Sequence, residues 1–62
     1  MTDEEIGVVE AMQKYGGGFV KALGSACWLA DEGNLALIKQ TWPDYWQRYT
    51  KLSQKKREAG KA

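Results

Sequence analysis

The sequence predicts an all-α protein, folded as a compact bundle of three or four helices. Apolar residues recur along it with the i, i+3, i+4, i+7 spacing of an amphipathic helix. Residues that favour helix starts precede these stretches, and glycines or the single proline, Pro43, interrupt them. Together these signals predict helices over residues of about 3–15, 18–31, 34–41 and 43–56.

The first helix is marked at both ends. Thr2 and Glu5 have the spacing of a capping box, in which each side chain accepts a hydrogen bond from the other residue's backbone N–H. Its end near Tyr15 follows from the three glycines at 16–18, which admit positive φ and suit a C-cap and turn. The alternative for this run is a phosphate-binding loop, but that motif needs a preceding strand and either a Lys-Ser/Thr pair or dinucleotide glycine spacing. We therefore expect a turn.

The middle of the chain predicts two helices joined by a short turn. Cys27 falls within the apolar stripe of the second helix, which favours a buried thiol over a reactive one. Gly33 suits the position after a helix end, and Asn34 suits the N-cap of the third helix. The third helix is short because Trp42 precedes proline and is pushed out of the α region.

The last helix is expected to begin at Pro43, because proline is favoured in the first helical position. Aromatic residues follow at helical spacing and predict its buried side, and the apolar series stops after Leu52. We expect residues 1–53 to form a single helical domain and residues 54–62 to form a basic, frayed tail. The core residues that the stripes predict are Ile6, Val9, Met12, Phe19, Leu23, Cys27, Leu35, Ile38, Trp42, Trp46 and Tyr49.

The composition excludes several kinds of chemistry. The 62 residues include one cysteine and no histidine, so neither an internal disulfide nor the usual zinc sites can form. Acidic residues fall mainly at expected helix starts, where capping accounts for them, whereas catalysis needs a positioned nucleophile, base and stabilising group. We predict no enzymatic activity, no cofactor and no metal. Without a signal sequence or an apolar run near the roughly 20 residues of a membrane span, a cytoplasmic location with no membrane partner is expected.

The charges are unevenly distributed along the chain. Residues 1–33 carry six acids and two bases, a net charge of −4, whereas residues 34–62 carry two acids and seven bases, a net charge of +5. Basic residues of the last helix, among them Arg48, Lys51 and Lys55, could contact phosphates, which makes a small nucleic-acid-binding accessory factor the alternative function. The acidic first half would repel a polyanion, and this favours a protein partner.

The seven aromatic residues are more than a core of this size encloses easily. Trp28 lies away from the centre of its apolar stripe and is the first candidate for contact with a protein, because Trp and Tyr dominate such interfaces. The alternative is that Trp28 covers the end of the bundle. We therefore predict a symmetric homodimer, which would bury spare aromatic surface and add stability that a small core lacks. The predicted partner-binding residues are therefore Trp28, Arg48, Lys51 and Lys55.

Three segments form a further pattern within residues 12–52. They are Tyr15-Gly16-Gly17-Gly18-Phe19-Val20-Lys21-Ala22-Leu23, then Leu29-Ala30-Asp31 with Asn34, then Trp42-Pro43-Asp44-Tyr45-Trp46-Gln47-Arg48-Tyr49. This pattern resembles a group of short phage and prophage open reading frames, in which serine often stands at the place of Gly18 and phenylalanine at that of Trp42. The resemblance implies an accessory protein that binds a host or phage protein and inhibits or alters it. It carries over no catalytic or binding residue.

Overall fold

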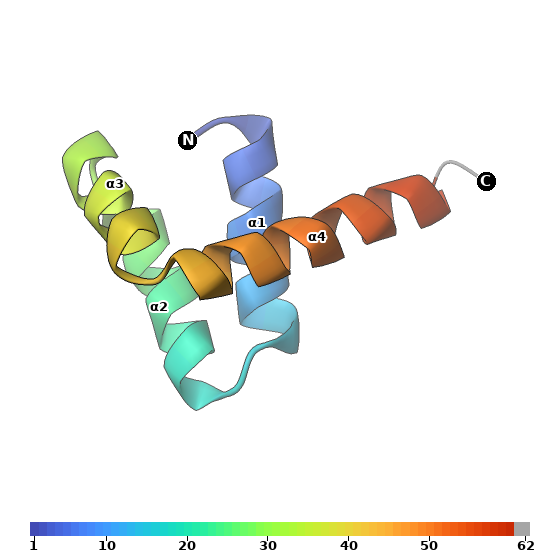
Figure 1. Cartoon of the computed structure of the whole chain (residues 1–62), viewed down its shortest axis with the longest axis horizontal. Helices are drawn as coiled ribbons and strands as arrows, with labels where there is room; N and C mark the ends of the chain where they lie inside the picture. The colour runs from blue at the N-terminus through green and yellow to red at the C-terminus, as the bar shows by residue number, and fades with distance from the viewer. Residues whose placement is uncertain (61–62) are drawn as a thin grey trace.

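The computed structural model describes the backbone of residues 1–60 and the side chains of residues 1–55. Four helices follow one another along this chain: α1 (Asp3–Tyr15), α2 (Gly18–Leu29), α3 (Glu32–Thr41) and α4 (Pro43–Gly60). The predicted all-α class is therefore confirmed. Helices α1 and α2 form a hairpin, α3 follows α2, and α4 crosses α1 with its C-terminal half extending beyond the other helices (Figure 1).

The start of α1 has the predicted capping box. The backbone N–H of Glu5 donates to Thr2 Oγ1 at 3.1 Å, and the backbone N–H of Thr2 donates to Glu5 Oε1 at 2.8 Å. Two N–H groups that the first helical turn cannot satisfy internally are thereby bonded. The start of α1 is thus fixed by residues that the sequence alone identifies.

The glycine run ends α1 by close packing rather than by positive φ. Gly16 is buried and has φ −74°, and the described residues include no glycine with positive φ. A Cβ atom at Gly16 would lie 2.5 Å from the carbonyl oxygen of Met12 and 2.6 Å from Val20 Cγ1. Gly16 is therefore the residue that lets the start of α2 approach the end of α1.

The start of α3 differs from the prediction. Asp31, not Asn34, is the N-cap, and its Oδ1 accepts the backbone N–H of Asn34 at 2.8 Å. Because the Asp31 carboxylate also favours the positive end of the helix, α3 begins at Glu32 and includes Gly33, while α2 ends at Leu29 instead of residue 31. The two helices are therefore joined by only two residues.

The last helix begins at Pro43 as predicted and continues to Gly60, beyond the expected end near residue 56. The segment 54–62, expected to be a frayed tail, is helical as far as Gly60. Its basic residues Lys56, Arg57 and Lys61 have side chains outside the described residues.

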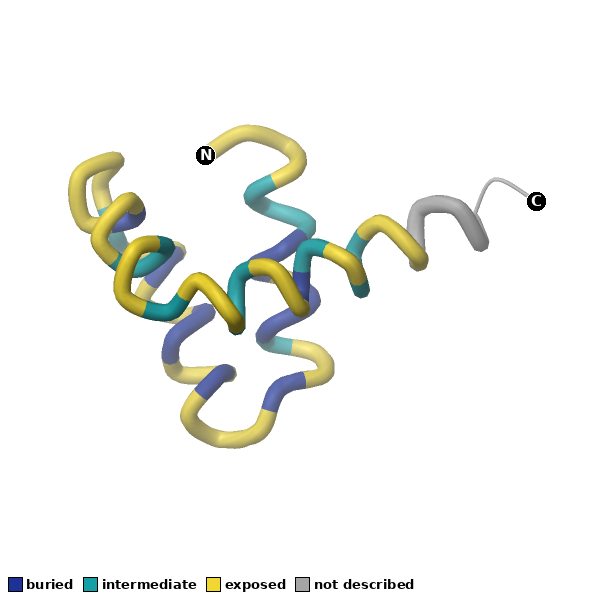
Figure 2. The backbone as a smooth tube through the Cα atoms, viewed as in Figure 1, coloured by how far each residue is buried: buried dark blue, intermediate teal, exposed yellow. Residues whose placement is uncertain are grey.

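The core lies where α1 faces α2 and α4, with α3 covering one end (Figure 2). Buried positions are concentrated on the facing sides of α1 and α2, and α1 packs closely against both α2 and α4. The buried hydrophobic residues are Val8, Val9, Ala11, Met12, Val20, Leu23, Cys27, Leu35 and Tyr49.

Phe19 is the clearest departure from the predicted core. Its side chain is 55% exposed, and the next residue, Val20, occupies the buried position instead. The reason is that α2 is apolar on two sides, so helical spacing alone does not decide which side faces inward. Of the other predicted core residues, Ile6, Ile38, Trp42 and Trp46 are half-buried, and Val9, Met12, Leu23, Cys27, Leu35 and Tyr49 are buried.

Candidate protein-binding face

The outer side of α2 and the adjoining side of α3 form an exposed apolar surface. We call this surface the α2–α3 face and define it by Phe19, Ala22, Ala26 and Leu29 of α2 and Leu37 of α3. Leu29 is 89% exposed, Leu37 is 57% exposed and Phe19 is 55% exposed. Large apolar side chains this exposed and this close together are typical of contact surfaces.

The face exists because α2 has more apolar surface than the bundle can bury. Val20 and Leu23 fill its inner side in a cluster with α1 and with Tyr49 of α4, and Cys27 packs in a second cluster with α1 and α3. The α2 residues of the α2–α3 face follow one another at spacings of three, four and three residues. They therefore lie together on a different side of the helix from the buried residues. A helix that is apolar on two sides is expected to be covered on both.

An open groove of about 420 Å³ runs along this face between α2 and α3. Leu29 and Leu37 stand on its two sides. None of its lining residues is charged, so an apolar side chain could enter without desolvating an ion. The lining residues are Ala26, Leu29, Ala30, Asn34, Leu37, Ile38, Thr41 and Trp42.

An aromatic cluster supports one end of the face. The ring of Phe19 meets Trp42 edge-on with centroids 5.7 Å apart, and it lies 5.9 Å from the ring of Tyr45. Such pairs contribute about 0.5–1.5 kcal/mol beyond area burial. Phe19 is therefore held in place on one side while more than half of its surface stays open to solvent.

Trp28 lies next to the most exposed residue of the face but is tied to α1. Its side chain is 44% exposed, and its indole Nε1–H donates to Gln13 Oε1 at 2.9 Å. The Gln13 amide in turn donates to Ser25 Oγ at 3.1 Å. Trp28 is thus an oriented ring at the end of α2, where its indole N–H already has a partner.

The basic residues predicted to bind a partner lie elsewhere. Arg48, Lys51 and Lys55 are exposed along α4, beside Asp44 and Leu52 of the same helix. The structure brings these three bases together on one side of a helix, but Trp28 is not among the residues beside them. The predicted partner-binding residues therefore belong to two surfaces.

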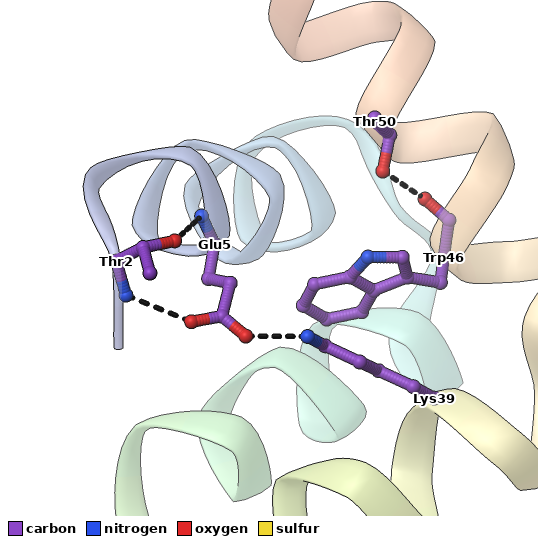
Figure 3. Close-up of polar contacts among 5 residues, drawn as sticks. All are labelled: Thr2, Glu5, Lys39, Trp46 and Thr50. Carbon is purple, nitrogen blue, oxygen red and sulfur yellow. Dashed lines mark hydrogen bonds and ion pairs between the residues drawn. The ribbon is translucent and has the colours of Figure 1, made fainter.

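A polar clasp joins α1, α3 and α4 (Figure 3). Lys39 Nζ binds the carboxylate of Glu5 and lies 4.8 Å from the centre of the Trp46 ring. The Thr50 hydroxyl donates to the backbone oxygen of Trp46 at 2.6 Å. The hydrogen bonds from Lys39 and from the Thr2 backbone lower the pKa of Glu5 from its usual 4.5 to about 2.

This clasp holds the three helices together, and its charged groups bind one another. Both carboxylate oxygens of Glu5 accept hydrogen bonds, one from Thr2 and one from Lys39. Cys27 is fully buried, and this burial raises the pKa of its thiol, which keeps the sulfur protonated and unreactive. Within the part of the chain that the structure describes, no three His, Cys, Asp or Glu residues are placed to hold a metal ion.

Comparisons with protein-family models, with curated proteins and with solved structures found no match to this chain. Among the residues described, no helix has both the length and the apolar character needed to cross a membrane.

Sequence reasoning missed the main elements of the α2–α3 face. It assigned Phe19 to the core and gave no contact role to Leu29 or Leu37. The signal was present, because Phe19 and Leu29 end a stripe separate from the one that contains Leu23. A second apolar stripe on one short helix indicates a second packing partner.

Proposed function

We propose that this chain is a non-enzymatic protein that binds a protein partner through the α2–α3 face. One observation carries the proposal: Leu29 and Leu37, 89% and 57% exposed, flank an uncharged apolar groove. Leaving such side chains in water is unfavourable by about 25 cal/mol per Å² of apolar surface, and a partner that covers them recovers this free energy. Trp28 at the end of α2 adds an oriented aromatic ring, a residue type enriched among interface hot spots.

The biological setting of the proposal comes from the sequence resemblance to short phage and prophage proteins. In that setting the partner is a host or phage protein in the host cytoplasm, and binding inhibits or alters it. A partner segment with the matching chemistry is an amphipathic helix, whose apolar side chains at i, i+3 or i+4, and i+7 can enter a groove between two helices.

The test is affinity capture with the tagged full chain from host cell extract, using three matched proteins. They are the wild type, a Leu29→Asp/Leu37→Asp variant, and a Gln40→Asp/Gln47→Asp control that places the same charges at exposed polar positions of α3 and α4. We expect at least tenfold less of the captured protein with the first variant and no change with the control. Equal capture by all three proteins would refute the proposal.

A second candidate function is nucleic-acid binding by α4. It is favoured by the alignment of Arg48, Lys51 and Lys55 at i, i+3 and i+7 along one side of α4. If this is the function, log K for an oligonucleotide falls linearly with log salt, and each Lys→Ala change at 51 or 55 lowers the slope by roughly 0.7–0.9. The Leu29→Asp/Leu37→Asp variant would then bind as well as the wild type.

A further inference from the structure

We infer that a second copy of this chain occupies the α2–α3 face, in an isologous dimer whose two α2 helices run antiparallel. The inference rests on the proposed function in that it uses the same docking face. It adds that a second copy of the chain covers this face when no other partner is present. It therefore predicts that self-association and partner binding compete.

The exposed stripe of α2 has the same spacing and the same order of large and small side chains in either direction along the helix. Phe19, Ala22, Ala26 and Leu29 are separated by three, four and three residues, with large side chains at the ends and small ones between. A two-fold axis at the level of Gly24 places each Ala22 opposite Ala26 of the second copy. The small residues then meet where the helices cross, and the large ones fill the space where the helices diverge.

The centre of the face suits contact with itself. In an isologous interface every residue near the axis also approaches its own counterpart, so a charge there would meet an identical charge. The stripe residues nearest the axis, Ala22 and Ala26, are uncharged, and the adjoining groove between α2 and α3 is also lined without any charged residue. Two copies can therefore approach without burying like charges.

The charges at the ends of the face favour the antiparallel arrangement. Lys21 lies near the Phe19 end of α2. Asp31 and Glu32 follow the other end of α2. Antiparallel pairing brings the basic end of one copy to the acidic end of the other, whereas parallel pairing would bring like charges together.

Sedimentation equilibrium of the full chain at ~100 μM tests this dimer, since small interfaces range down to micromolar affinity. The wild type should sediment at twice the chain mass of 7.0 kDa. Ala26→Glu should sediment at 7.0 kDa, because it places a carboxylate at the helix crossing. Gln47→Glu, which adds the same charge on exposed α4, should remain dimeric.

Mixing two variants tests the arrangement of the helices. Since residue 26 faces residue 22 of the second copy, Ala26→Glu mixed with Ala22→Lys should recover the mass of two chains, although each alone is monomeric. A mixture that stays monomeric overturns the antiparallel register. A wild type at 7.0 kDa, or an Ala26→Glu protein as dimeric as Gln47→Glu, overturns the dimer itself.

Far-UV circular dichroism establishes that each variant keeps its helices. If Ala26→Glu loses them, Leu29→Asp replaces it, because that side chain is 89% exposed and its loss leaves the core intact. Failure of this inference differs from failure of the proposed function. A monomeric wild type that captures a partner through Leu29 and Leu37 refutes only the dimer, and a dimer that captures none refutes only the proposed function.

Discussion

Replacement of Gly16 by alanine should destabilise the protein, whereas the same change at Gly17 should not. A Cβ at residue 16 would lie 2.5 Å from the Met12 carbonyl oxygen and 2.6 and 2.8 Å from Cγ1 and Cβ of Val20. At Gly17 a Cβ would meet nothing within 4 Å. The two glycines have φ of −74° and −76°, which alanine also adopts, and Gly17 is in addition the N-cap of α2, where glycine is preferred to alanine.

The expected magnitudes follow from these contacts. Overpacking a core costs about 1–3 kcal/mol, and alanine recovers ~0.4–1 kcal/mol by restricting the unfolded chain. Gly16→Ala should therefore lower Tm by roughly 5–15 °C in a domain of this size, and Gly17→Ala should change it by only a few degrees, since the loss of the glycine N-cap of α2 offsets the entropic gain. Thermal and urea unfolding followed by far-UV circular dichroism, at one protein concentration, measures both. Equal Tm values for the two variants would refute close packing at the hairpin.

Three further predictions concern single side chains. Because the folded-state pKa of Glu5 is lowered from 4.5 to about 2, its stabilising effect should be complete above pH 4.5 and fade as pH falls toward 2. Urea unfolding over this range should show a smaller loss of stability for Glu5→Gln than for the wild type, and an identical loss would show that the Lys39 pair is not formed. Cys27 should react with a thiol reagent only as fast as the protein unfolds, whereas rapid reaction of the native protein would contradict its burial. Trp28→Phe removes the hydrogen bond to Gln13 and should lower the free energy of unfolding, measured with urea, by about 0.5–1.5 kcal/mol. An unchanged free energy of unfolding would show that this bond contributes nothing.

The local elements of this fold could be predicted because their signals lie within a few residues. Thr2 and Glu5 fix the start of α1, and Pro43 fixes the start of α4, each through its own backbone chemistry. The predicted start of α3 at Asn34 was wrong, because Asp31 and Asn34 are both good N-caps only three residues apart. The structure resolves this choice in favour of the carboxylate.

Contacts between distant residues could not be predicted in the same way. Glu5 and Lys39 are 34 residues apart, and nothing in their local sequence pairs them. The exposure of Phe19 and Leu29 depends on which side of α2 meets α1, and that choice depends on the close approach at Gly16 and Gly24. Periodicity locates apolar stripes, but the tertiary packing decides which stripe remains outside.

The most direct test of the α2–α3 face as a contact surface is a methyl NMR dilution series on the full chain. We predict that concentration-dependent shifts occur at the methyl groups of Ala22, Ala26, Leu29 and Leu37, whereas those of buried Val9 remain constant. Spectra that do not change with concentration, or changes confined to α4, would contradict contact between two copies through this face.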